Sequence, residues 1–191
     1  MRKIFGIVST CVLLLCTSVK AEVSFGFGLM AGQVSASGTE TEGTAADTSV
    51  RTKSFEEFFV GADIFLENTL SNGMTFGVSY VPVDVEIAAG KRTDTNGSDP
   101  AENDDGDRSA SADLSDMITL YGNFPLGGNG AYALAGMHFT TVSTTETLPN
   151  SSYGNEDIYG AMIGLGVKEG NGKLELFYSD FEDISISSTG G

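Results

Sequence analysis

The sequence of 191 residues has little of several residue types that stabilise other classes of exported protein. Its only cysteines are Cys11 and Cys16, it contains no tryptophan, and proline occurs four times. Both cysteines precede Ala21, where cleavage is predicted below, so the remaining chain cannot contain a disulfide. Its stability must have another source, which a closed and fully hydrogen-bonded sheet would supply.

Basic residues are also scarce. The chain has 10 lysines and arginines against 26 aspartates and glutamates, which gives a formal net charge of −16. Removal of a leader that contains Arg2, Lys3 and Lys20 would leave −16 − 3 = −19. A surface of this sign repels phosphates, so nucleic acid is excluded as a partner.

Only one long apolar stretch is present, at residues 4–16. It follows Arg2 and Lys3 and precedes the small-residue site Val19-Lys20-Ala21. This order predicts a secretory signal peptide at 1–21 and a single mature domain at 22–191. The stretch is shorter than the roughly 20 residues of a membrane-spanning helix. A lipoprotein signal ending at Cys16 is a further alternative, disfavoured because Leu15 stands where a small residue is expected.

Apolar residues alternate with small or polar residues in seven segments, which predicts β-strands. The segments are residues 23–31, 57–67, 74–83, 113–124, 131–142, 157–168 and 173–184; in the fifth, both faces are half apolar and the phase is ambiguous. Glycine takes nearly every second position of the first and sixth. The residues predicted to face outward in mid-strand are Val60, Ile64, Ile118, Leu120, Ile163 and Leu176.

The predicted connections alternate in length. Long polar segments at 34–54, 84–112 and 143–156 alternate with short turns at 68–73, 125–130 and 169–172. Transmembrane barrels have short periplasmic turns and longer external loops, so 84–112 is predicted to be external and 125–130 periplasmic. A soluble sandwich or lipocalin-like barrel also alternates, but a face of glycines makes a poor soluble core. We therefore predict an all-β, antiparallel, up-and-down transmembrane β-barrel with its apolar face toward lipid.

With its export signal, its loop rhythm and the glycine-interleaved segment Val23-Ser-Phe-Gly-Phe-Gly-Leu29, the chain resembles the small eight-stranded outer-membrane barrels of the OmpA and opacity-protein type. The resemblance covers residues 23–184 and implies a fold and the cell outer membrane, with the barrel-assembly machinery as a partner. It departs from the family at the end, since seven strands of the expected eight are visible. We therefore expect a chain that lacks its last strand at the C-terminus; a seven-stranded barrel is the alternative.

The expected function is a structural or surface-interaction role through acidic external loops, exerted by a monomer among outer-membrane lipid and lipopolysaccharide. A narrow porin-like channel is the alternative, and a lipid A-modifying enzyme a more distant one. No catalytic residue, cofactor or metal site is predicted. The acidic segment Asp94–Asp107 contains Asn103-Asp-Asp-Gly-Asp107, which resembles part of a calcium loop. It lacks an acid near Ala101 and a downstream bidentate glutamate, so a solvated loop is favoured, with weak divalent-ion bridging to lipopolysaccharide as the alternative.

Two other groups could carry chemistry. His138, the only histidine, has Thr140 on its face and Glu146 in the following loop, the residue types of a nucleophile and its base. The simpler interpretation of His138 is a polar interface residue near the outer end of a strand. Asp63 and Glu175 are predicted to point inward, where Lys168 or Lys173 could pair with them. An eight-stranded barrel has an interior that side chains fill, so a packed polar interior is expected rather than an open pore.

Overall fold

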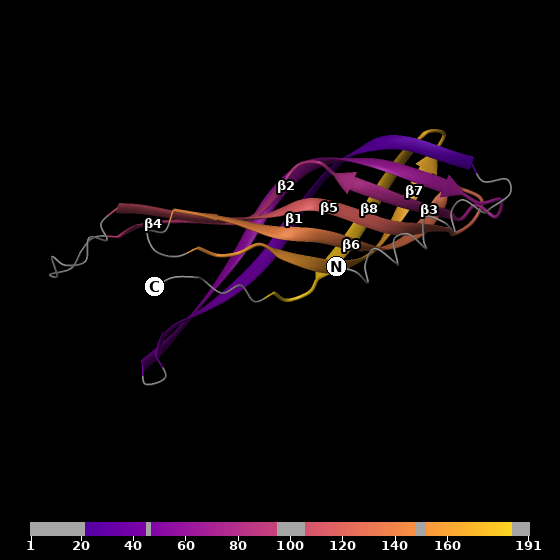
Figure 1. The fold of residues 1–191 in the computed structure, drawn as a ribbon. Helices are drawn as coiled ribbons and strands as arrows, with labels where there is room; N and C mark the ends of the chain where they lie inside the picture. Colours follow the sequence, from indigo (N-terminus) through magenta and orange to yellow (C-terminus); the bar gives the residue numbers. More distant parts are fainter. Residues whose placement is uncertain (1–21, 45–46, 95–105, 148–151, 185–191) are drawn as a thin grey trace, which may run out of the picture.

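The computed structural model describes residues 22–44, 47–94, 106–147 and 152–184 as one antiparallel sheet with no helix in these ranges (Figure 1). The strands are β1 (Glu22–Thr44), β2 (Asp47–Thr69), β3 (Thr75–Val81), β4 (Val85–Asp94), β5 (Gly106–Pro125), β6 (Ala131–Glu146), β7 (Glu156–Glu169) and β8 (Gly172–Phe181). They pair in the order β1-β2-β3-β5-β6-β7-β8, and β4 also pairs with β5. The sheet curls into a half-barrel, which confirms the all-β, antiparallel part of the prediction.

No helix in the described ranges is long and apolar enough to cross a membrane.

β3 and β4 are two pieces of one strand path. β3 pairs with β5 between Met117 and Asn123, and β4 pairs with β5 beyond Leu114, so both lie along the same edge of β5. The chain between them contains Pro82, which has no N–H to donate to a ladder. With β3 and β4 counted as one path, the seven predicted strands are confirmed.

The two ends of the sheet differ in how the strands are connected. Residues 70–74, 126–130 and 170–171 connect strands at one end, which we call the turn end. The predicted short turns are confirmed there. Gly73 and Gly130 have φ of 85° and 78°, a backbone conformation that side chains with a Cβ rarely adopt.

The opposite end, which we call the hairpin end, corrects the prediction of long loops. The sequence predicts a loop at residues 34–54, but residues 34–44 and 47–54 form the outer halves of β1 and β2, paired without a break to Thr44 and Asp47. In Figure 1 this two-stranded ribbon projects away from the rest of the sheet. Segment 84–112 likewise contains β4 and the start of β5, and its residues 95–105 lie outside the described residues. The sequence of the outer halves of β1 and β2 is mostly polar, so it carries no apolar alternation that would mark a strand.

Four of the inward glycines lie beneath aromatic rings of the neighbouring strand. Gly26 is paired with Phe65, Gly77 with Tyr121, Gly166 with Tyr132 and Gly160 with Phe181. In each pair the ring lies where a Cβ on the glycine would stand. A large inward side chain therefore folds flat over the adjacent strand, as aromatic residues do beside glycines in sheets. This confirms a glycine-rich inner face.

Replacing Gly77 with alanine should test this packing. The new methyl group would overlap the Tyr121 ring, and overpacking of this kind typically costs about 1–3 kcal/mol. We expect a lower free energy of unfolding by that amount in a urea titration of the refolded protein. Gly128→Ala is the matched control, because a Cβ there meets nothing within 4 Å. Equal stability of the two variants would contradict the ring placement.

The interior changes character along the strands. Toward the hairpin end, Val85, Leu114, Val142 and Ile158 form a buried apolar cluster, against which Phe59 and Phe181 pack. Toward the turn end, the buried side chains are largely polar and include Glu67, Thr75, Asn123 and His138. The phase of β6, left open by the sequence, is settled by the inward positions of Tyr132, Leu134 and His138.

Candidate functional site: the polar interior near the turn end

An ion pair crosses the interior between strands that are not neighbours. Lys173 Nζ of β8 lies 2.6 Å from Glu67 Oε1 of β2, and the Glu67 side chain is only 4% exposed. The ammonium also lies 4.0 Å from the centroid of the Phe65 ring, within the range of a cation–π interaction. Lys173 therefore connects the last strand to the second strand through both charge and ring contact.

Two tyrosines complete the network. The hydroxyl of Tyr121 donates to Glu67 Oε1 over 2.8 Å, and that of Tyr132 donates to Glu175 Oε1 over 2.6 Å. Lys173 Nζ lies 3.7 Å from Glu175 Oε1. The carboxylates of Glu67 and Glu175 thus interact with one ammonium and two phenol groups. Hydrogen bonds to a charged group are stronger than those between neutral groups.

The predicted inward charges are found here in part. Glu175 points inward and Lys173 pairs with it, as predicted. Asp63 is half-buried and accepts a hydrogen bond from Ser79. Lys168 is exposed at the rim, and no ion pair engages its ammonium within the described part of the chain. The sequence interpretation missed Glu67, although it has the same parity along β2 as Asp63 and could have been assigned inward on that ground.

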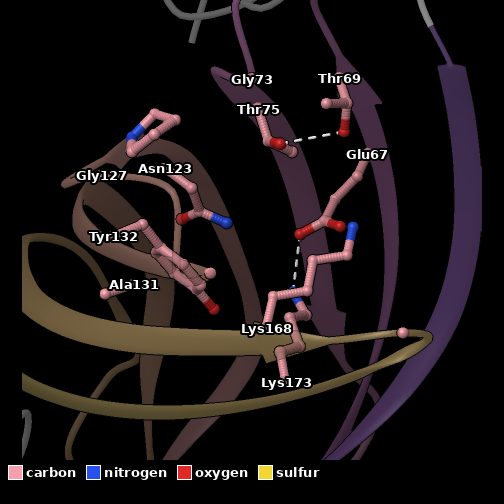
Figure 2. A pocket seen from close by; sticks show the side chains of 13 residues that line it. Glu67, Thr69, Gly73, Thr75, Asn123, Gly127, Ala131, Tyr132, Lys168 and Lys173 are labelled. Carbon is pink, nitrogen blue, oxygen red and sulfur yellow. Dashed lines mark hydrogen bonds and ion pairs between the residues drawn. The ribbon is translucent and has the colours of Figure 1, made fainter.

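A cavity of about 300 Å³ lies between this network and the three turns. Figure 2 shows Asn123, Tyr132, Glu67 and the two lysines arranged around it. Thr69 and Thr75 form one wall, and their hydroxyl oxygens are 2.9 Å apart. The cavity is polar on the network side, and glycine, proline and alanine of the turns form its rim.

Among the buried residues that line the cavity, Asn123 is the one whose side-chain oxygen has no protein partner in the described structure. It is 7% exposed and lines the cavity. A cavity of this size and polarity can hold water, and water can donate to that oxygen. The turn end of the interior is therefore a polar recess that can hold water beside the Glu67–Lys173 network.

His138 occupies a different place from the one the sequence indicated. It is buried inside the sheet and not at an interface, with Nδ1 2.8 Å from Thr119 Oγ1 and Nε2 2.8 Å from Ser179 Oγ. Its ring stacks on Phe181 with the centroids 5.3 Å apart. These contacts link β6 to β5 and β8 and use both ring nitrogens, which is the arrangement of a histidine that holds strands together.

The proposed catalytic neighbours of His138 are engaged elsewhere. Thr140 shares the inward face but donates to the backbone oxygen of Ser115 over 2.7 Å. Glu146 accepts from the backbone N–H of Tyr153 over 2.5 Å. Glu146 lies eight positions after His138, roughly 26 Å along an extended strand. The structure does not bring the three residues into one cluster.

The calcium-like segment Asn103-Asp-Asp-Gly-Asp107 lies mostly outside the described residues. Its last member, Asp107, accepts a hydrogen bond from Thr93 Oγ1 over 2.7 Å across the β4–β5 ladder. In the described part of the chain, no three histidines, cysteines, aspartates or glutamates are grouped as a metal would require.

Comparison with family models, with curated proteins and with solved structures finds no match to the chain. Its function has to be inferred from the surface and interior of the sheet.

Proposed function

We propose that the protein is an exported β-barrel of a bacterial outer membrane, with a structural or surface-interaction role carried by its acidic hairpin end. The observation that supports this most strongly is the outer face of the sheet. Large apolar side chains are exposed there, with Phe27 and Leu29 79% and 83% exposed in β1 and Leu176 81% exposed in β8. Antiparallel sheets of soluble proteins turn polar residues to water, and an apolar surface this continuous needs a lipid or protein cover.

The outward apolar positions form a band across the strands. In β1 they are Val23, Phe25, Phe27 and Leu29, and in β7 they are Ile163, Leu165 and Val167. β2 and β8 repeat the pattern with Phe58, Val60, Ile64, Leu66, Leu174, Leu176 and Tyr178. The β1 run from Val23 to Ala31 is nine residues long, which suits the roughly 9–11 residues that a tilted membrane strand requires.

Toward the hairpin end, the apolar band ends in aromatic residues, which are favoured at membrane interfaces. On β2, β3, β6, β7 and β8, the last apolar outward residue is aromatic: Phe58, Tyr80, Phe139, Tyr159 and Tyr178. On β2, β6, β7 and β8 the outward residues just beyond are polar, namely Glu56, Thr141, Asp157 and Asp180, and Thr141 Oγ1 donates to Asp157 Oδ1. Aromatic girdles at both edges of the lipid-facing band are typical of outer-membrane barrels.

The interior favours a structural role over a channel. The Glu67–Lys173 network crosses the turn half beside the cavity, and Val85, Leu114, Val142 and Ile158 pack together in the hairpin half. An apolar plug of this kind would oppose the passage of ions. The outer halves of β1 and β2 extend beyond the apolar band and their sequence is mostly polar, which suits contact with the environment.

Protease digestion of intact cells tests the proposed location and orientation. A broad-specificity protease should cut the β4–β5 connection and spare the 126–130 turn, because the turn would face the periplasm. Lysed cells are the control, in which both connections should be open to cleavage. Cutting at the Pro125 turn in sealed cells would invert the orientation, and protection of both ends would place the protein elsewhere.

A further inference from the structure

The first and last strands of the sheet each leave one edge unpaired within the described residues. Six antiparallel pairings, β1/β2, β2/β3, β3/β5, β5/β6, β6/β7 and β7/β8, connect these two strands. Because the number of pairings is even, β1 and β8 run in the same direction. Each edge presents N–H and C=O groups that would be costly to leave unpaired in a membrane.

The opening between these edges is narrow at the turn end. Lys173 of β8 reaches Glu67 and the ring of Phe65, both on β2, the strand next to β1. The Lys173 side chain therefore reaches from β8, on one side of the opening, to β2, the neighbour of β1 on the other side. The sheet has curled far enough for its two edges to face one another.

We propose that the opening between β1 and β8 is an acceptor for one additional β-strand, which runs antiparallel to both edges and closes the barrel. One strand satisfies both edges with antiparallel ladders because the edges are parallel to each other. A second copy of the protein cannot do so. Copies that share one orientation in a membrane present β1 and β8 edges that all run the same way, and these could pair only in parallel. The exclusion of a second copy rests on the proposed membrane location. The direction of the accepted strand rests only on the strand pairing.

The side chains at the opening indicate the chemistry of the incoming strand. Its outward residues would lie between Phe27 and Leu29 of β1 and Leu176 of β8, so they should be apolar. Its inward residues would meet a crowded surface, since the side chains of Phe65 and Asp63 already lie over Gly26 and Gly28. These positions should be glycine, alanine or serine. The partner is thus an extended segment in which small and apolar residues alternate.

β7 provides a probe with this pattern. Its outward residues Ala161, Ile163 and Leu165 alternate with Gly160, Met162, Gly164 and Gly166, so the pattern is met once Met162 of the peptide is replaced by alanine, and β7 pairs antiparallel with β8 in the folded chain. A synthetic peptide of residues 156–169 with Met162→Ala can therefore be offered to the free edges. The protein would be the full chain in detergent with Cys11→Ser and Cys16→Ser, with one spin label at Phe27→Cys on β1 or at Leu176→Cys on β8. The peptide would carry a second label at its Ile163 position.

We expect dipolar broadening with the label on β1 and with the label on β8, because one peptide lies between both edges. A label at Ile118→Cys on β5 should show none, and a peptide with Met162→Pro and Gly164→Pro should broaden neither edge, since it lacks ladder donors. Broadening at one edge alone, or at neither, would overturn the proposal. So would broadening between singly labelled copies without peptide, which would make a second copy the occupant. Lipid exposure of Ile163, measured without peptide, tests the membrane location separately.

Discussion

Arginine in place of Ile163 should lower the free energy of unfolding by about 2–4 kcal/mol in lipid bilayers, because the charge would sit near the bilayer midplane. Ile163 lies in the middle of the outward apolar run of β7 and is 65% exposed. The same substitution at an exposed site of a soluble protein changes stability by no more than about 0.5 kcal/mol. Reversible denaturant titration of the protein in vesicles measures the difference.

Two comparison variants make the result specific to the outer face. Thr141→Arg places the charge outward beyond Phe139, next to Asp157, and should cost about 0–1 kcal/mol, as charges near the interface do. Gly164→Arg places it inward against the backbone of Leu176 and Phe177, and should prevent folding in detergent and in bilayers alike. If Ile163→Arg were as harmless as Thr141→Arg, the apolar face would not meet lipid.

Replacing Lys173 with methionine should cost about 3 kcal/mol or more, since removal of one partner of a buried pair leaves an uncompensated charge. Glu67 is 4% exposed and would lose its ammonium partner, keeping only the Tyr121 hydroxyl. Denaturant unfolding in detergent is the measurement, because the effect arises inside the sheet and does not need a bilayer.

A second substitution separates charge from packing. Lys173→Met combined with Glu67→Gln should regain most of the lost stability, because the amide needs no counter-charge. Lys168→Met at the exposed rim of the same cavity is the matched control and should change little. Equal effects of the two methionine variants would show that the Glu67–Lys173 pair does not hold β8 against β2.

Apolar alternation predicted the strands that bury one face, and it failed where neither face is apolar. The mid-strand positions Ile163 and Leu176 are outward as expected, because period two assigns a face to each residue once the strand is recognised. The outer halves of β1 and β2 were mistaken for a loop, since their backbone pairing leaves no trace in a polar sequence. β4 (Val85–Asp94) was likewise assigned to a loop, because the predicted strand at 74–83 ended beside Pro82.

The sequence predicts which single residues point into the interior, but it does not predict which of them contact one another. Alternation assigns Asp63 and Glu175 inward, but it does not say that Lys173 reaches Glu67 across the sheet. That contact depends on strand order, curl and register, which join residues 106 positions apart in the chain. His138 shows the same limit, since its partners Thr119 and Ser179 come from two other strands.

Collision measurements on spin labels test most directly whether the outer face of this sheet meets lipid. Single labels at Ile163, Leu176 and Phe27, in a background with Cys11→Ser and Cys16→Ser, would be examined after reconstitution into bilayers. The account predicts that oxygen, which dissolves in lipid, relaxes these labels more than a water-soluble nickel chelate, and that a label at Thr141 shows the reverse. Labels at Ile163 and its outward neighbours that respond to the nickel chelate, in a protein that stays monodisperse without detergent, would contradict it.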